Sequence, residues 1–391
     1  MTNVQSYDYI IAGAGCAGLS LAWFLVHEGP GNRKILIADQ SLQARDDKTW
    51  CFWSSAGIPD AALIDHEWQK LEIRTDNHHG ISGLTPYGYY CVQSDSYHRK
   101  MTSVLRESTN IDWVECRIDD IDTQNNRARL HTSKGTFDAD YIFQSIRPVD
   151  IDAHELNLKQ HFIGWEIRTE KPVFNTEAAC FMDLSVKQRE GITFMYILPY
   201  SGSQAIFEYT LFSEHLLPAE TYETEIRQYL KDRFNLDEDA YTVIRKERGI
   251  IPMVDNGFMP AQNERVINIG ASAGLAKAST GYTFTRTHTT NRKIVQLLKS
   301  GQPPVPQNPS PRRFRAYDIL LLYIIKYHPA SALEIFETLF KKNRLVNILK
   351  FLSEETHIGE EIKIFWSLPH RPFFKAIYGA RRLLLTAFSS R

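Results

Sequence analysis

The sequence predicts an α/β protein with two interleaved domains and a helical C-terminal region, and three observations predict it. A G-x-G-x-x-G turn, at Gly13, Gly15 and Gly18, separates a run of buried-strand residues from an apolar helical run. Longer β-type runs fill residues 148–254. The chain beyond residue 311 has a helical pattern and is rich in Leu, Ile, Phe and Tyr.

The glycine turn is typical of a Rossmann-type nucleotide site. Residues 9–12 have the pattern of a central parallel strand, and Gly13 allows the tight turn that follows. Gly15 lets the backbone approach a pyrophosphate, and Gly18 lets the next helix pack close to the strand. The N-terminus of that helix favours a phosphate, because its free N–H groups and its dipole both attract negative charge.

The elements after the turn favour this interpretation over an ordinary glycine-rich loop. Residues 19–27 read as a helix, and residues 34–38 read as a second strand that ends at Asp39. An acid at this position commonly holds a ribose hydroxyl. The order of strand, turn, helix, strand and acid therefore predicts a dinucleotide-binding domain.

The composition argues against several other classes of protein. The 391 residues carry a net charge of −1, which gives no electrostatic case for a nucleic-acid partner. The five cysteines are scattered without a C-x-x-C and the histidines form no H-E-x-x-H, so we predict no disulfide framework and no metal site, in a reducing cytoplasm. We expect no leader before the first strand, and the longest apolar run, residues 319–325, is too short for a spanning helix of ~20 residues.

The segment after Asp39 is less regular. Residues 45–53 form a loop dense in charges and aromatics, which we interpret as lining the cofactor or the substrate through Thr49 and Trp50. A hydrophobic anchor for the loop would have the same composition. Further runs predict a small antiparallel patch and then a strand that returns to the central sheet, at residues 111–116, 127–132, 135–137 and 138–145.

The second domain places one carboxylate among apolar side chains. Its fourth β run, residues 204–212, alternates between two faces, and Glu208 shares its face with Ile206 and Phe212. Such surroundings would raise the pKa of Glu208. The other predicted elements of this domain are strands at residues 160–169, 178–184, 192–198 and 241–254 and a helix at 221–234.

A second contact with the cofactor is predicted near residue 270. Residues 265–274 read as a strand that runs into a small-residue turn at Gly270 and Ala271, and residues 277–284 lead past Gly281 into a helix. A cofactor that spans the first and last segments of the domain fits FAD better than free NAD. The predicted domains are residues 1–147 with 255–300 for FAD, 148–254 for the substrate, and 311–391 for the helical region.

The helical region differs from the rest of the chain in charge. Residues 311–391 hold 14 Lys and Arg against 7 Asp and Glu, and the five prolines of residues 301–311 predict a stiff linker before them. Mixed basic and aromatic residues are typical of helices on an anionic membrane surface. A cap on the substrate domain would have the same composition, and both can hold together. We expect a cytoplasmic protein, peripheral on the inner face of the cytoplasmic membrane.

Six segments carry a family resemblance over nearly the whole chain, at residues 13–18, 49–52, 162–166, 207–210, 247–253 and 277–284. Together they resemble the bacterial lycopene cyclases of carotenoid biosynthesis. In that family the segment matching residues 207–210 carries the proton donor, which falls on Glu208. Many members have a second acid where this chain has Tyr209. Two carboxylates adjacent in sequence are therefore not available here.

The resemblance implies a lycopene β-cyclase, an intramolecular lyase or isomerase. It implies reduced FAD, with NADPH or another electron donor, and no net redox change. An acid would protonate a terminal double bond of lycopene, and ring closure and loss of a proton would leave a β-ionone ring, giving γ-carotene and then β-carotene. The substrate contacts that we expect are Trp165, Phe207, Tyr209, Thr210 and Phe284. The cofactor contacts that we expect are Gly13, Gly15, Gly18, Asp39, Thr49, Trp50, Gly270, Ala271 and Gly281.

Two alternatives remain open from the sequence. An FAD-dependent oxidoreductase that acts on a lipid, such as a hydroxylase or a prenyl reductase, would use the same cofactor, and the product mass would distinguish it. A non-catalytic flavin-binding or membrane-adaptor protein would explain the glycine turn and the basic tail, but not the glutamate among aromatic residues. The oligomeric state and the number of lycopene ends that are cyclised also stay open.

Overall fold

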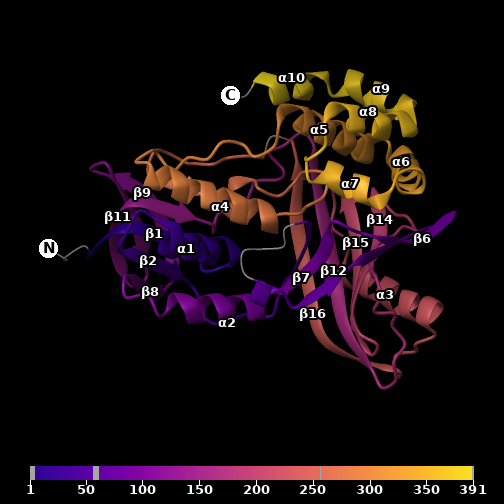
Figure 1. The fold of residues 1–391 in the computed structure, drawn as a ribbon, viewed down its shortest axis with the longest axis horizontal. Coiled ribbons are helices and arrows are strands. Elements are labelled where there is room, and N and C mark those ends of the chain that lie inside the picture. Colours follow the sequence, from indigo (N-terminus) through magenta and orange to yellow (C-terminus); the bar gives the residue numbers. More distant parts are fainter. Residues whose placement is uncertain (1–4, 56–60, 256, 390–391) are drawn as a thin grey trace.

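The computed structural model describes residues 5–55, 61–255 and 257–389, and these ranges form an α/β fold with two large sheets and a helical cap (Figure 1). The fold class is the one that the sequence predicts. The outermost ends of the predicted domains, residues 1–4 and 390–391, lie outside the described residues.

The first large sheet includes the strand that leads into the glycine turn. Its strands β8, β2, β1, β11 and β17 pair in parallel, and β10 and β9 continue it in the antiparallel sense. Their bounds are β8 (Ile111–Glu115), β2 (Ile35–Asp39), β1 (Gln5–Ala12), β11 (Gly135–Gln144), β17 (Val266–Asn268), β10 (Arg127–Thr132) and β9 (Ile118–Gln124).

The first strand of the predicted antiparallel patch is assigned wrongly. Residues 111–115 form β8, which pairs in parallel with β2 at the edge of the sheet. The reason is the helix α2 (Ser94–Leu105), which carries the chain back so that β8 runs in the same direction as β2. Helices α1 (Cys16–Glu28) and α4 (Phe284–Lys299) pack beside α2 on one face of the sheet, around the core that includes Ile11, Ile37 and Phe143.

The second large sheet is built mainly from the predicted substrate domain. In order, its strands are β16 (Tyr241–Val254), β12 (Asn157–Thr169), β15 (Gln204–Ser213), β14 (Ile192–Ser201), β13 (Ala179–Asp183), β5 (Lys70–Thr75) and β6 (His78–Gly83). The last two strands correct the predicted domain boundary, because residues 70–83 lie within the range 1–147. They join this sheet because Leu71 and Ile73 pack into its core.

A small sheet connects the two large ones. It consists of β3 (Thr49–Ser54), β7 (Gly88–Gln93) and β4 (His66–Trp68). Thr49 and Trp50 therefore lie on a strand, whereas the sequence predicts a loop. Pairing of Cys51 with Cys91 and of Trp53 with Tyr89 fixes the register and holds β3 against the cavity described below.

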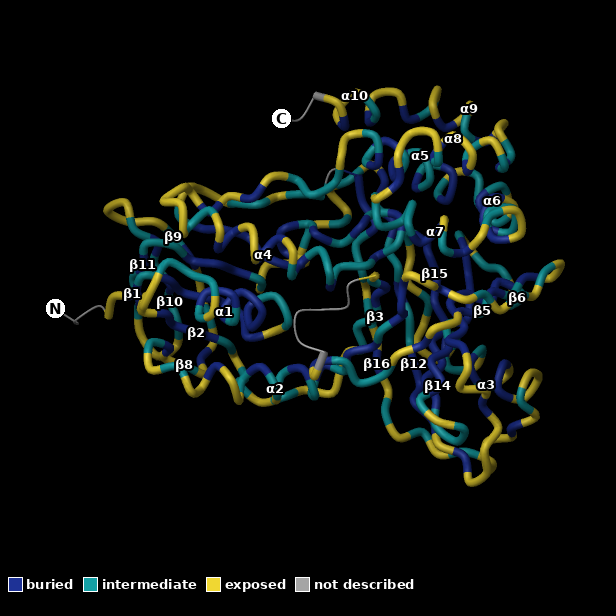
Figure 2. Tube along the Cα trace, in the orientation of Figure 1, coloured by how far each residue is buried: buried dark blue, intermediate teal, exposed yellow. Residues whose placement is uncertain are grey.

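The two faces of the second sheet are covered by different elements. Helix α3 (Ala219–Phe234) packs on one face, and helices from the C-terminal region pack on the other (Figures 1 and 2). The cap consists of α5 (Arg312–Tyr327), α6 (Pro329–Lys342), α7 (Leu345–Leu352), α8 (Ile358–Ser367), α9 (His370–Gly379) and α10 (Arg381–Ser389). Among the described residues, we find no helix with the length and hydropathy needed to cross a membrane.

Candidate active site

The glycine turn has the shape of a dinucleotide cradle. Gly13 has a φ of +110°, which favours glycine, and a side chain on Gly18 would lie 1.9 Å from the carbonyl oxygen of Gly13. Open space surrounds Gly15, the N-cap of α1, and no side chain caps the helix there. The first amides of α1 are thus available to a phosphate, so these three glycines fit the predicted group.

The other predicted cofactor residues lie around this turn. The carboxylate of Asp39 accepts a hydrogen bond from the amide of Ala14 at 2.7 Å, which fixes the acid beside the glycine turn. Gly270 begins the short helix η2 (Gly270–Ala273) with a φ of +60°, and a side chain on it would lie 2.6 Å from Cβ of Ala17. The structure therefore brings the turns at residues 13–18 and 270–273 together, although they are far apart in sequence.

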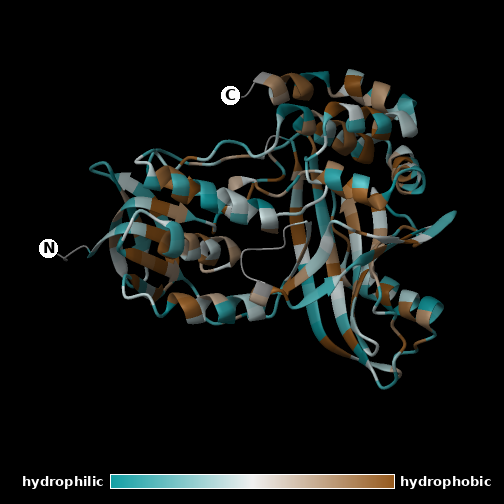
Figure 3. Cartoon of the chain, viewed as in Figure 1, coloured by the Kyte–Doolittle hydropathy of each residue, from teal (hydrophilic) through white to brown (hydrophobic). Residues whose placement is uncertain are grey.

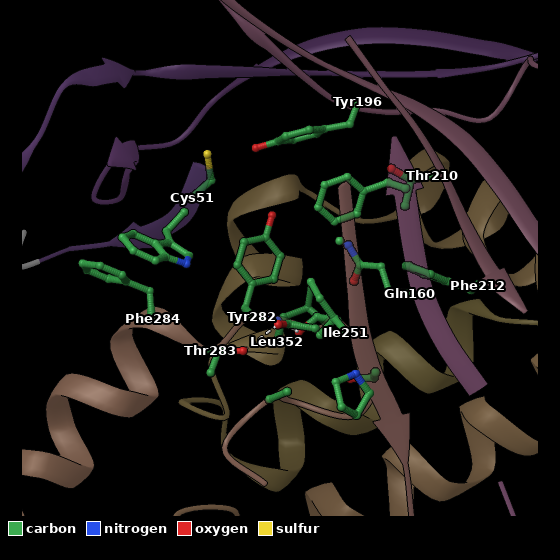
Figure 4. Close-up of a pocket in the computed structure, with 18 of the residues that line it drawn as sticks. Cys51, Gln160, Tyr196, Thr210, Phe212, Ile251, Tyr282, Thr283, Phe284 and Leu352 are labelled. Atoms are coloured by element: carbon green, nitrogen blue, oxygen red, sulfur yellow. Dashed lines mark hydrogen bonds between the residues drawn. The ribbon is translucent and has the colours of Figure 1, made fainter. Parts of the chain in front are cut away.

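An apolar cavity of about 580 Å³ runs from this cradle to the helical cap (Figure 4). Its lining residues come from three parts of the chain. Gly15, Gly270, Ala271 and Gly281 line it from the cofactor side, Glu208, Thr210 and Glu247 from the second sheet, and Phe336, Phe340, Phe365 and Phe373 from the cap. A pocket of this size and character suits a largely apolar ligand with a few polar contacts.

Glu208 is a buried acid on β15 that faces this cavity. Burial, the charge of Glu247 and a hydrogen bond with Glu247 raise the pKa of Glu208 well above its ordinary value, while Arg245 opposes the shift. The carboxyl group therefore keeps its proton at a pH where an exposed glutamate has lost it. A protonated carboxyl in an apolar cavity is suited to act as a general acid.

Glu247 supplies a second carboxyl group beside Glu208. In the sheet, Gly164 on β12 pairs with Glu208 on one side and with Glu247 on the other. Because Gly164 has no side chain, the two glutamates can meet across it; a Cβ there would lie 2.9 Å from Cγ of Glu208 and 3.2 Å from Cγ of Glu247.

Two residues fix the position of Glu247. Its Oε2 accepts hydrogen bonds from Thr49 Oγ1 at 2.7 Å and from Arg245 Nη1 at 2.6 Å. Arg245 also donates to Thr49 at 2.9 Å and to Glu166 at 2.8 Å. The hydroxyl of Thr49, predicted to contact the cofactor, thus forms its hydrogen bonds with Glu247 and Arg245.

Tyr196 and Tyr282 add polar groups to the wall of the cavity, and the buried Tyr89 lies behind them. Tyr196 pairs with Glu208 across β14 and β15. The hydroxyl of Tyr89 lies 2.6 Å from that of Tyr196 and 2.8 Å from that of Tyr282. Figure 4 shows Tyr196 and Tyr282 facing the same space. Their rings can attract a cation.

The predicted substrate residues divide between the two faces of the sheet. Thr210 and Phe284 line the cavity, and Phe284 stacks on Phe52 with ring centroids 4.9 Å apart. The structure corrects the prediction for Trp165, Phe207 and Tyr209, which pack under α3 on the opposite face. The physical reason is the alternation of strand residues, which turns both neighbours of Glu208 away from the cavity.

Sequence reasoning missed Glu247, Tyr196, Tyr282 and Gly164 as parts of the site. The signal for Glu247 was present, because it begins the segment 247–253 that supports the family resemblance. Its place beside Glu208 depends on strand order, which the sequence pattern does not provide. Trp50 does line the cavity from β3, as expected of a cofactor or substrate contact.

Comparisons with known proteins find similar sequences. Residues 8–378 match the family model described as "Lycopene cyclase protein". A lycopene beta-cyclase from Pantoea ananas is 26% identical over 291 residues, which cover 71% of this chain and 71% of that protein.

Solved structures show the same fold at low sequence identity. A geranylgeranyl bacteriochlorophyll reductase-like protein from Thermoplasma acidophilum superposes with a TM-score of 0.63 at 12% identity, covering 97% of this chain and 100% of that one. A variant of the halogenase PltM in complex with FAD gives a TM-score of 0.57 at 10% identity, covering 92% and 85%. At these identities the likeness concerns the fold alone.

Proposed function

The chain belongs to the lycopene cyclase family, and we propose that it is a lycopene β-cyclase in which Glu208 is the proton donor. The observation that carries this proposal is the buried acid itself. Glu208 faces an apolar cavity that continues to the dinucleotide cradle, and its pKa is raised by burial and by Glu247. An acid that keeps its proton among apolar side chains can protonate an unactivated double bond.

The proposed reaction balances without a net oxidation or reduction. Glu208 donates its proton to the terminal double bond of one lycopene end, which leaves a tertiary carbocation. The neighbouring double bond attacks this centre and closes a six-membered ring that carries the positive charge. Transfer of a ring proton back to the carboxylate of Glu208 restores a double bond and regenerates the acid. The apolar lining excludes water that would otherwise add to the cation, and the rings of Tyr196 and Tyr282 stabilise it.

FAD is the cofactor that we propose for the cradle. The residues that would hold it are Gly13, Gly15, Gly18, Asp39, Gly270, Ala271 and Gly281, with Trp50 beside it. Once reduced by NADPH or another donor, bound FAD would supply negative charge that stabilises the carbocation. These backbone groups of the chain bind and orient a pyrophosphate without any change of their own charge.

The product of the purified enzyme tests the proposed function. With FAD, a reductant and lycopene, we expect γ-carotene and β-carotene, both with the mass of lycopene. In a lycopene-accumulating bacterium, cells should turn from red to orange. A product with added oxygen would support a hydroxylase, and one with added hydrogen would support a prenyl reductase; either result would overturn the proposal.

We further propose that α8, α9 and α10 contact an anionic membrane surface. Their outer sides carry apolar residues that are largely exposed, including Trp366 at 78%, Tyr378 at 74% and Phe374 at 70%. On α8, the exposed residues Ile358, Ile362 and Trp366 recur every four positions, so they form one stripe. Figure 3 shows hydrophobic residues along these outer helices.

Charge and position favour a lipid surface over another occupant. The exposed charged residues of these helices are basic, namely Lys363, Arg371, Lys375, Arg381 and Arg382. The carboxylates in their sequence are Glu360 and Glu361, which pair with Lys350 and Arg313. Neighbouring residues of the same helices, Phe365 and Phe373, line the cavity. A polyene dissolved in the membrane would therefore reach Glu208 through the surface that touches the lipid.

Liposome sedimentation measures this contact. We expect the wild-type chain to bind vesicles of phosphatidylcholine with phosphatidylglycerol, and Arg381→Gln with Arg382→Gln to lose about 2 kcal/mol, or ~30-fold in affinity. Trp366→Ser with Phe374→Ser should also weaken binding, whereas Met259→Ser, which changes an exposed methionine outside the cap, should not. Equal binding by all variants, or a dimer that these changes dissociate, would contradict a lipid contact.

A further inference from the structure

The partner of Glu208 has one oxygen without a donor. Glu247 Oε2 accepts two hydrogen bonds, but Glu247 Oε1 is buried and, among the described residues, receives none from an amide, amine, guanidinium or hydroxyl group. Leaving a buried carboxylate oxygen without a hydrogen bond is costly. The carboxyl of Glu208 lies beside it, and a protonated Glu208 is the donor that Oε1 lacks.

The surrounding residues hold the side chain of Glu247 in place. Arg245, whose side chain is 8% exposed, forms an ion pair with its carboxylate, and Thr49 donates a hydrogen bond to it. Because the guanidinium and the hydroxyl occupy Oε2, a proton shared by the pair has its place between Oε1 and Glu208. The arrangement assigns the proton to Glu208, the member that faces Tyr196 across the strands.

We propose that Glu247 is a positioning residue, which holds the transferable proton on Glu208 through its fixed charge and its free oxygen, and that Gly164 is the gap that lets the two acids meet. This inference rests on the proposed cyclisation, in which Glu208 is the acid. It adds the residue that the segment 207–210 lacks, because the second carboxyl comes from β16, which β12 separates from β15 in the sheet.

The other ionisable groups around Glu208 do not replace this role. They are Arg245 on β16, Cys51 on β3, Tyr196 on β14 and Tyr282 before α4. Burial raises the pKa of both tyrosines above the ordinary value, so their phenols stay neutral. Arg245 acts in the opposite direction, because its positive charge lowers the pKa of Glu208. Glu247 is thus the charged group that favours the protonated acid.

The decisive variant is Glu247→Gln, which removes the charge and keeps the shape. Cyclisation requires protonated Glu208, so activity falls as pH rises through its pKa. Without the negative neighbour that pKa drops, and we expect the alkaline limb of the pH–rate profile to move down by about one to three pH units. Infrared titration of the Glu208 carbonyl band, assigned by its loss in Glu208→Gln, should show the same shift. Glu247→Asp should restore part of it.

Matched controls separate this role from a structural one. Glu166→Gln removes another buried carboxylate that pairs with Arg245, and it should leave the alkaline limb of the pH–rate profile at its wild-type position. Gly164→Ala retains both acids but forces them apart, and should lower the infrared midpoint; Gly83→Ala, with open space at its Cβ, should not. An unmoved limb and midpoint in Glu247→Gln would overturn the inference.

The infrared titration also keeps this inference apart from the proposed function. It reports the proton of Glu208 whether or not lycopene is converted. If the wild-type chain forms no cyclic product but the midpoint still shifts in Glu247→Gln, the acid pair stands and the cyclase proposal fails. If product forms and the midpoint does not shift, the cyclase stands and the role of Glu247 fails.

Discussion

Glu208→Gln should abolish cyclisation while the chain still folds and binds flavin. Glutamine has nearly the same volume as glutamic acid but has no proton that it can give to a double bond. Since the carbocation forms only after this transfer, we expect the rate of ring formation to fall by about 10³-fold or more. The measurement is carotenoid chromatography from the lycopene-making host, together with the flavin absorbance of the purified variant. The exposed Glu170, just beyond β12, provides the control Glu170→Gln, which should remain active.

The same variant should become more stable than the wild type as the pH rises. In the folded chain the pKa of Glu208 is raised, so between the ordinary pKa and the folded value the unfolded chain binds fewer protons than the folded one. Stability of the wild type therefore falls across this window, by up to about 1.4 kcal/mol for each pH unit. Gln cannot titrate, so the difference in melting temperature between variant and wild type should grow with pH. A variant that unfolds more readily at every pH would point to a structural role for Glu208, and full cyclisation would remove it from the mechanism.

Lys277→Met should be the most destabilising change outside the acid pair. Lys277 lies 5% exposed in the turn after η2, and its Nζ donates to both carboxylate oxygens of Asp318 at 3.0 Å and to Glu354 at 2.8 Å. Removal of the cation leaves the buried carboxylate of Asp318 without its charged partner, while Glu354 keeps Arg286 and Ser310. Loss of one member of a buried ion pair costs about 3–5 kcal/mol. Because these residues join the turn at Gly281 to α5 and to the segment after α7, the helical cap should loosen first.

Urea denaturation measures this effect, with Lys350→Met as the control. Lys350 forms an ion pair with Glu360 at 2.7 Å in the same cap, but the two side chains are about one third exposed. An exposed pair contributes only ~0–1 kcal/mol, so the control should unfold close to the wild type. Equal denaturation midpoints for the two variants would show that the buried cluster does not hold the cap.

The parts of the fold that follow from local pattern were predictable. The glycine turn, the alternating strands and the five prolines each constrain a short stretch of chain, and the strands β12, β15 and β16 lie close to their predicted bounds. Which strands pair with one another was harder to predict from the sequence. Nothing in the local pattern of residues 70–83 shows that they extend the second sheet beside β13. Residues 111–115 likewise show a strand but not its direction.

In the candidate site, too, the sequence predicts what depends on local pattern and not what depends on strand pairing. Glu208 stands out because its own strand surrounds it with apolar residues, and alternation alone separates it from Phe207 and Tyr209. Glu247 becomes visible only when β12 places Gly164 between the two acids, a relation that spans 83 residues from Gly164 to Glu247. The absence of a second acid at Tyr209 is thus compatible with a carboxyl pair, because sheet pairing provides what sequence adjacency does not.

A single acid pair beside one cavity determines the order of events for a substrate with two identical ends. In the proposed reaction both ends of lycopene need Glu208, and a long, stiff polyene cannot turn round inside about 580 Å³. Under this proposal each molecule would have to leave the cavity, reverse its direction and insert again before the second ring closes. The enzyme would then work distributively, and the ratio of one-ringed to two-ringed product would depend on how many lycopene molecules compete for each cavity.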